Sequence, residues 1–280
     1  MVSQRFQGVF LNWINRNGAP SWGHEPEAFD ASSITKTLRL VRWMFDPGGP
    51  WQVTVEGLQH VENSPALIVS NHSGGTTILD AWGLGYLWYT TFGTRRPLHF
   101  LAHEWVAPFR ALGEAFARRG VLGAARDTAA RVLTALRDLV IFPGGDLDSW
   151  RPYRRRREVE FGGRVGYARL ALESGVPVVP LAHAGAQETL RVLSDGRSFA
   201  RRIGLRKLAR AHVFPIALSL PFGLTVGPWP HLPFPARMRY RFGEPVVPEK
   251  REPGRPIEKE EVLAFDAEVR ARIGAQLQTL

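Results

Sequence analysis

The chain repeatedly places a short apolar run directly before a turn rich in glycine or proline. Three such runs end at the turns 70–75, 142–148 and 181–187, and longer segments with helical periodicity separate them. Strands that alternate with helices are typical of crossover units in a parallel sheet. The sequence therefore predicts an α/β fold in which a mostly parallel central sheet is flanked by helices.

The chain has 280 residues, a length that fits one large α/β domain. We assign 50–280 to this domain and 1–49 to an N-terminal, amphipathic, membrane-facing segment. The helix expected at 34–45, with Ser33 as its cap, fits either a membrane surface or an ordinary cover of the sheet. The other expected helices are 77–89, 105–116, 128–136, 165–173 and 258–278, and the expected strands are 51–56, 66–70, 98–102, 138–142 and 176–181, followed by a β-like region at 213–246.

Charge and composition narrow the function classes. The chain has no cysteine, which excludes disulfides, thiolate catalysis and cysteine-bound metals. The formal net charge of +10 favours anionic partners such as acidic lipid headgroups, phosphorylated cosubstrates or nucleic acid. Nine tryptophans and sixteen phenylalanines beside many arginines fit a membrane interface. We expect no nucleic-acid partner, because no known binding motif is present.

No segment predicts insertion into a membrane as a helix. We find no signal peptide at residues 1–15. The longest uncharged stretch, 211–236, is interrupted by prolines and glycines, which favours strands and turns over a spanning helix. We therefore expect a cytoplasmic protein that lies peripherally on the inner face of a membrane.

The turn after 66–70 carries the strongest candidate for chemistry. It reads Asn71-His72-Ser73-Gly74-Gly75. A histidine can accept a proton from a hydroxyl near neutral pH, but it needs an acid at its other nitrogen to fix the tautomer. Asp80, in the next helix, is the nearest such acid. The alternative is a structural histidine that caps the helix.

Two further features follow in the chain. The turn Phe142–Asp148 contains Pro143, Gly144 and Gly145, and its backbone N–H groups could hold an oxyanion or a phosphate. It lacks the spacing of a P-loop or dinucleotide fingerprint. An arginine run comes next, and arginine forks match phosphate oxygens, although a solvated loop is the alternative. The run and its neighbours are Arg151, Arg154, Arg155, Arg156, Arg157 and Arg164.

Together the three motif blocks resemble those of the lysophospholipid/glycerolipid acyltransferase superfamily, in the branch related to monoacylglycerol and diacylglycerol acyltransferases. The third block is Val176-Pro177-Val178-Val179-Pro180, and the resemblance covers roughly 50–247. It implies an acyl-CoA or acyl carrier protein donor, a hydroxyl of a glycerolipid or lysophospholipid as acceptor, and no metal or other cofactor. It also implies His72 as general base, with Asp80 as its partner. We assign substrate binding to Asn71, Ser73, Gly74, Gly75, Pro143, Gly144, Gly145, Asp148, Arg151 and Arg164.

The sequence departs from the better-known members at two positions. Their His-x4-Asp spacing would place the acid at Thr77, whereas Asp80 follows His72 after a gap of seven residues. Their Phe-Pro-Glu-Gly block has Glu where this chain has Gly144. The glycine favours the Phe-Pro-Gly-Gly branch and weakens the case for a phosphorylated glycerol acceptor.

Two other functions stay open at this point. One is a serine hydrolase that uses Ser70 or Ser73 with His72, although no Gly-x-Ser-x-Gly elbow is present. The other is a basic, peripheral lipid-binding protein without catalysis.

Overall fold

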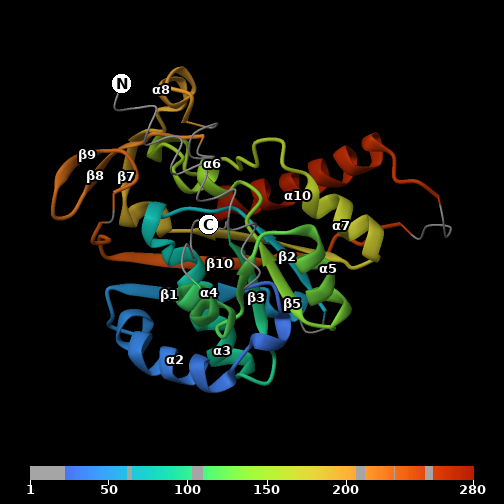
Figure 1. Ribbon diagram of the computed structural model, residues 1–280. Coiled ribbons are helices and arrows are strands. Elements are labelled where there is room, and N and C mark those ends of the chain that lie inside the picture. The colour runs from blue at the N-terminus through green and yellow to red at the C-terminus, as the bar shows by residue number, and fades with distance from the viewer. Residues whose placement is uncertain (1–22, 62–64, 103–109, 206–211, 230, 250–254) are drawn as a thin grey trace.

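The computed structural model describes residues 23–280 except 62–64, 103–109, 206–211, 230 and 250–254. A seven-stranded sheet forms its centre, in the order β1-β10-β6-β2-β5-β3-β4 (Figure 1). All neighbouring strands are parallel except β10 and β6, so the predicted, mostly parallel α/β fold is confirmed. The strands are β1 Trp51–Glu56, β2 Leu67–Ser70, β3 Leu98–Ala102, β4 Val121–Gly123, β5 Asp138–Ile141, β6 Val178–Ala184 and β10 Ala236–Phe242.

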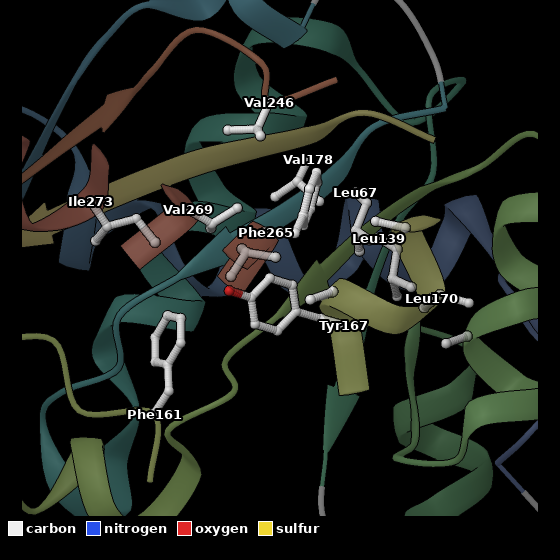
Figure 2. Close-up of a cluster of buried hydrophobic side chains, with 14 of the residues drawn as sticks. Leu67, Leu139, Phe161, Tyr167, Leu170, Val178, Val246, Phe265, Val269 and Ile273 are labelled. Atoms are coloured by element: carbon white, nitrogen blue, oxygen red, sulfur yellow. The ribbon is translucent and has the colours of Figure 1, made fainter. Parts of the chain in front are cut away.

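Helices cover both faces of this sheet and close two apolar cores. One core packs α5, α7 and α10 against the sheet, and the other packs α2 and α3 against the opposite face. Figure 2 shows the first core, where Phe265 and Val269 of α10 lie near Val178. The helices are α2 Ala31–Phe45, α3 Leu79–Phe92, α4 Arg110–Ala117, α5 Arg126–Thr134, α6 Gly145–Ser149, α7 Gly166–Ser174, α8 Arg197–Arg202 and α10 Lys259–Thr279.

A second, three-stranded sheet lies at one end of the molecule (Figure 1). It consists of β7 Arg191–Ser194, β8 Ile216–Ser219 and β9 Gly223–Val226, all antiparallel. The sequence predicted a β-like region here but neither β7 nor α8. The described helices include none that is long and apolar enough to cross a membrane.

Helix α2 begins earlier than expected and belongs to the core that it forms with α3 and the sheet. Its N-cap is Asp30, whose carboxylate accepts the backbone N–H of Ser32 at 2.9 Å, so Ser33 is not the cap. Ile34 and Phe45 are buried in the core that α2 shares with α3. The predicted boundary at 49/50 therefore does not coincide with a break in packing.

Other predicted elements are present with shifted ends. The helix expected at 105–116 is described only as α4, from Arg110, and its beginning lies outside the described residues. The helix expected from Thr77 begins at Leu79 because a 3-10 turn, Gly75–Thr77, precedes it. This turn matters for the site described below.

The parallel arrangement brings the predicted turns together. β2 pairs with both β5 and β6 in parallel, so the carboxyl ends of these three strands lie at one edge of the sheet. The chain leaves this edge through the turns that begin at Asn71, Phe142 and Gly185. Ligands of open α/β sheets bind at such an edge.

The opposite edge is fixed by a buried carboxylate. Asp138, the first residue of β5, accepts hydrogen bonds from Nε and Nη2 of Arg96 at 2.7 and 3.0 Å. It also accepts the backbone N–H of Ala66 at 3.0 Å. The Arg96 guanidinium lies over the rings of Trp88 and Phe92, so this pair ties β5 to α3.

Replacing Asp138 by alanine should lower the free energy of unfolding by about 3–5 kcal/mol, because Arg96 and the Ala66 N–H lose a buried partner. Urea unfolding followed by circular dichroism measures the change. Arg110→Gln, which removes the exposed pair with Glu114, is the control and should leave stability nearly unchanged. Equal effects of the two substitutions would contradict the role given to Asp138.

Candidate active site

The turn after β2 is held by the side chain of Asn71. Its Nδ2 donates to the carbonyl oxygen of His183 at 3.0 Å, and its Oδ1 accepts the backbone N–H of His183 at 3.0 Å. The amide thereby continues the pairing of β2 with β6 beyond the last ladder residue. Because Asn71 is fully buried, we reassign it from substrate binding to positioning of the turn.

The predicted contact between His72 and Asp80 is present. The Nδ1 atom of His72 lies 2.6 Å from Oδ2 of Asp80. Asp80 is fully buried, whereas 13% of the His72 side chain is exposed. With Nδ1 turned to a carboxylate, the tautomer that carries its proton on Nδ1 is favoured, which leaves the Nε2 lone pair free to accept a proton.

The seven-residue gap between the two residues has a structural cause. The His-x4-Asp spacing would place the acid at Thr77, which is here the last residue of the 3-10 turn Gly75–Thr77. The Thr77 hydroxyl donates back to the carbonyl oxygen of Gly74 at 3.1 Å. Ile78 then adopts a left-handed conformation with φ of 42°, which is rare for a β-branched residue. Helix α3 begins directly after this residue, and Asp80 in its first turn, rather than Thr77, contacts the imidazole.

Asp80 remains a carboxylate despite its burial. Burial raises the pKa of Asp80, but its interactions with His72, with His183 and with the Ser73 N–H together outweigh this effect, and the net pKa lies below its usual range. The backbone N–H of Ser73 donates to Oδ2 at 2.9 Å, and that of Ala81 donates to Oδ1 at 2.9 Å. Its place in the first turn of α3 also favours negative charge.

The second predicted turn supplies the other wall of the site. The ring of Phe142 stacks on the imidazole of His72, with centroids 4.6 Å apart and an interplanar angle of 27°. This contact limits the orientations that the imidazole can adopt. The structure therefore brings the first and second motifs together through their side chains.

Asp148 clamps the backbone of His72 from the opposite side. Its Oδ2 accepts the His72 N–H at 2.6 Å, and its Oδ1 accepts the Glu160 N–H at 3.1 Å. Both oxygens are used by the protein and the side chain is fully buried. We therefore reassign Asp148 from substrate binding to positioning of His72.

Arg151 is the counter-ion of Asp148 and not a free phosphate ligand. Its Nη1 donates to Asp148 and its Nη2 donates to the carbonyl oxygen of Arg156 at 3.1 Å. The side chain is fully buried, and burial lowers the pKa of the guanidinium to about 10, which leaves it charged at neutral pH. We accordingly withdraw the predicted phosphate contact of Arg151.

Arg164 stabilises the glycine turn itself. It donates to the carbonyl oxygens of Pro143 and Gly144 at 3.2 and 2.5 Å, and to Asp146 at 2.8 Å. Carbonyl and carboxylate partners thus occupy the fork that was expected to hold a phosphate. Gly145 has a φ of 48°, the left-handed conformation that glycine adopts at low cost.

The arginine run is also largely paired within the protein. Arg155 donates to Glu158 at 2.6 Å, Arg156 lies over the ring of Tyr153, and Arg157 donates to the carbonyl oxygen of Gln278 at 3.3 Å. Arg154 is exposed. The run therefore does not form a cluster of free forks at the site.

A second histidine, which was not among the predicted site residues, lies behind the first. The Nε2 atom of His183 lies 2.7 Å from the Ser73 hydroxyl and 3.4 Å from Oδ2 of Asp80. His183 is 1% exposed, and burial lowers its pKa to about 4, although the charge of Asp80 opposes this effect. His183 is therefore neutral near pH 7, and Ser73 is a partner of this buried histidine.

The only sequence signal for His183 was its position near the end of β6, beside the third turn. Tyr240 gave no signal at all, since it comes from the distant strand β10. Its hydroxyl donates to the backbone carbonyl oxygen of Asp80 at 2.8 Å and so supports the start of α3. Both contacts depend on strand neighbours that are far apart in the chain.

Comparisons with known proteins agree with the motif analysis. The model of a family described as Acyltransferase matches residues 52–184, just under half of the chain, and this segment includes both turns of the site. A protein of Mycobacterium tuberculosis strain H37Rv is 28% identical over 208 residues, or 74% of this chain and 55% of its own length. A Mycobacterium leprae protein is 27% identical over 197 residues, or 70% of this chain and 51% of its own length. The chain thus spans about half the length of the curated relatives it matches.

The fold is also similar to a crystal structure of 1-acyl-sn-glycerophosphate acyltransferase from Thermotoga maritima. The TM-score is 0.47 with 17% sequence identity, over 88% of this chain and 79% of that chain. The family match covers the segment in which His72, Asp80 and Asp148 meet. The matched segment also contains all three motif blocks.

Proposed function

We propose that the protein transfers a fatty acyl group from a thioester donor to a hydroxyl of a glycerolipid or lysophospholipid, with His72 as general base. The observation that carries the proposal is the 2.6 Å contact of His72 with the buried, charged Asp80, inside the segment that matches the acyltransferase family. Acyl-CoA or acyl carrier protein is the proposed donor.

In the proposed reaction, Nε2 of His72 takes the proton of the acceptor hydroxyl, and the hydroxyl oxygen attacks the carbonyl carbon of the thioester. Asp80 stabilises the imidazolium that forms. When the tetrahedral intermediate collapses, the C–S bond breaks and the leaving thiolate recovers the proton from His72. The N–H groups of His72 and Ser73 already donate to carboxylates, so we assign the oxyanion to the remaining N–H groups of the glycine turns.

The acceptor is best matched by a lipid whose hydroxyl is not next to a phosphate. A Cβ at Gly144 would overlap the Asp148 side chain and the carbonyl oxygen of Glu160. The glutamate of the better-known members therefore cannot be placed at this position without displacing Asp148. This supports an acceptor like those of the monoacylglycerol and diacylglycerol acyltransferases.

The serine hydrolase is less well supported. Ser70 and Ser73 are buried, and their hydroxyls face His183 rather than His72. One nitrogen of His183 faces both Ser73 and Asp80, whereas a triad needs the two on opposite nitrogens of the ring. Ser70 faces the other nitrogen at 3.4 Å, but Ser70 and His183 are fully buried, which closes both to a substrate. A binding protein without catalysis would not need a buried acid that fixes the tautomer of a partly exposed histidine.

An acyl-transfer assay tests the function directly. Labelled acyl-CoA would be offered with a panel of monoacylglycerol, diacylglycerol and lysophospholipid acceptors, and the products identified by mass spectrometry. We expect an esterified lipid and free CoA in equal amounts. Release of free fatty acid at the same rate with and without acceptor would contradict transfer and indicate a hydrolase.

His72→Ala should lower kcat by roughly 10²–10⁴-fold, because the acceptor hydroxyl loses its base. Steady-state kinetics measure this loss. A thermal melt measures stability separately, and the melting temperature should fall, because the buried Asp80 carboxylate loses its imidazole partner. The kinetics are therefore compared below the melting transition. His60→Ala, at a histidine of the 3-10 turn Leu58–Val61, is the matched control and should keep full activity. Retention by His72→Ala of more than a tenth of wild-type turnover would exclude His72 as the base.

Asp80→Asn should lower kcat by roughly 10²-fold or more with a smaller effect on KM, because an amide neither fixes the tautomer nor stabilises the imidazolium. The split between kcat and KM is the informative readout, because an acid that orients the base affects the chemical step more than substrate binding. An unchanged kcat would show that Asp80 only supports the fold.

We also propose that the protein works peripherally at the inner, cytoplasmic face of a membrane. The formal net charge of +10 supports attraction to anionic lipids. The lipid acceptor of the proposed reaction would be supplied by such a surface.

A further inference from the structure

The outer face of the small sheet is apolar where an antiparallel sheet would ordinarily be polar. The inner face of β7 and β8 is already buried, because Val192 and Ala217 pack with Leu147 and Trp150. Sheets with one face on a core normally alternate apolar-in and polar-out. Here Leu218 and Leu224 pair across β8 and β9 and are both exposed.

The exposed apolar surface continues beyond the strands. Phe222, in the turn between β8 and β9, is 62% exposed, and Leu224 is 65% exposed. Trp229 follows β9 and is 60% exposed, and Phe199 of α8 is exposed on the neighbouring element. We call this surface the hairpin patch; its members are Leu193, Phe199, Leu218, Leu220, Phe222, Leu224, Val226, Trp229 and Leu232.

Positive charge accompanies the hairpin patch. The sequence from Arg191 to Leu232 holds seven arginine or lysine residues and one acid, Asp195. The acid is already paired with Arg197 at 2.8 Å. Arg201 and Arg202, at the end of α8, are exposed. An exposed apolar surface with basic residues on the neighbouring helix α8 complements an anionic lipid surface, with aromatic rings at the level of the headgroups.

The segment that carries the end of the hairpin patch also contacts the candidate active site. The Thr76 hydroxyl donates to the carbonyl oxygen of Trp229 at 3.3 Å. The Thr77 hydroxyl lies 3.3 Å from Nε2 of His231. The segment between β9 and β10 thus contacts the turn that links His72 to Asp80. A surface that the patch touches would meet the protein beside the site.

We propose that the hairpin patch docks the protein on an anionic lipid bilayer, with the turn at Phe222 and the ring of Trp229 inserted at the headgroup boundary. The proposal rests on the proposed function in one respect, since a bilayer would present the lipid acceptor beside His72. It also replaces α2, the helix singled out in the sequence, as the membrane-binding element. Much of the apolar face of α2 lies in the core, whereas the patch has no such cover among the described residues.

Vesicle sedimentation shows whether the hairpin patch or α2 binds the membrane. The probe is a set of phosphatidylcholine vesicles with and without phosphatidylglycerol. Phe222→Thr/Leu224→Thr should reduce binding to the anionic vesicles roughly tenfold or more, because two exposed apolar side chains are lost. Phe222→Leu/Leu224→Ile keeps the surface apolar and should bind like the wild type. Leu40→Gln/Trp43→Gln, at exposed positions of α2, is the matched control and should also retain binding.

Arg201→Gln/Arg202→Gln should weaken binding to the anionic vesicles and reduce its dependence on salt, because two lipid-facing charges are removed. Loss of vesicle binding in the α2 variant, with binding retained in the Phe222→Thr/Leu224→Thr variant, would overturn the proposal. So would a wild-type dimer that this variant converts to a monomer in light scattering, since a second copy would then be the occupant of the patch.

Activity on detergent-dispersed substrate distinguishes this proposal from the proposed function. The Phe222→Thr/Leu224→Thr variant should keep wild-type kcat there and lose activity only on vesicles. If the wild type binds vesicles through the patch but transfers no acyl group, the docking surface stands and the proposed function fails. If transfer occurs but the variant binds vesicles as the wild type does, the docking proposal alone fails.

Discussion

The candidate site depends on a carboxylate that is fully buried and still charged. Placing an ion inside a protein costs several kcal/mol unless hydrogen bonds and an opposite charge compensate. Asp80 obtains this compensation from the imidazole of His72 and from two backbone N–H groups, those of Ser73 and Ala81. The turn cannot move away without leaving the charge unpaired. The charge of Asp80 and the orientation of His72 are therefore maintained by the same contacts.

A second buried carboxylate applies the same principle from the other side of the turn. Asp148 accepts the His72 N–H and is neutralised by Arg151, which has no exposed surface. Consecutive backbone N–H groups, those of His72 and Ser73, thus donate to different acids. This arrangement also explains Gly144, since a side chain there would displace Asp148. The two motif blocks are in effect one structural unit built around the backbone of His72.

The site lies between two sheets with different surfaces. The seven-stranded sheet supplies the catalytic candidates at the carboxyl ends of its parallel strands β2, β5 and β6, which are themselves buried. The antiparallel sheet supplies an apolar, basic surface that contacts the same turn through Thr76 and Thr77. In the proposed arrangement, the large sheet positions the groups that transfer the proton, and the small sheet binds the lipid surface. The two sheets meet at the 3-10 turn Gly75–Thr77.

The sequence by itself determined the α/β class, the parallel strands and the pairing of His72 with an acid nearby. These features follow from local patterns: apolar runs of strand length, glycine turns and a short separation along the chain. It did not determine the roles of Asp148, Arg151 and Arg164, because a charged residue in a loop looks the same in sequence whether it faces solvent or a buried partner. The order of the strands decided those roles, together with those of His183 and Tyr240. Burial is set by which strands become neighbours, and that depends on contacts between distant segments. The residues in contact are 76 apart for His72 and Asp148, and more than a hundred apart for the contacts of His183 and Tyr240.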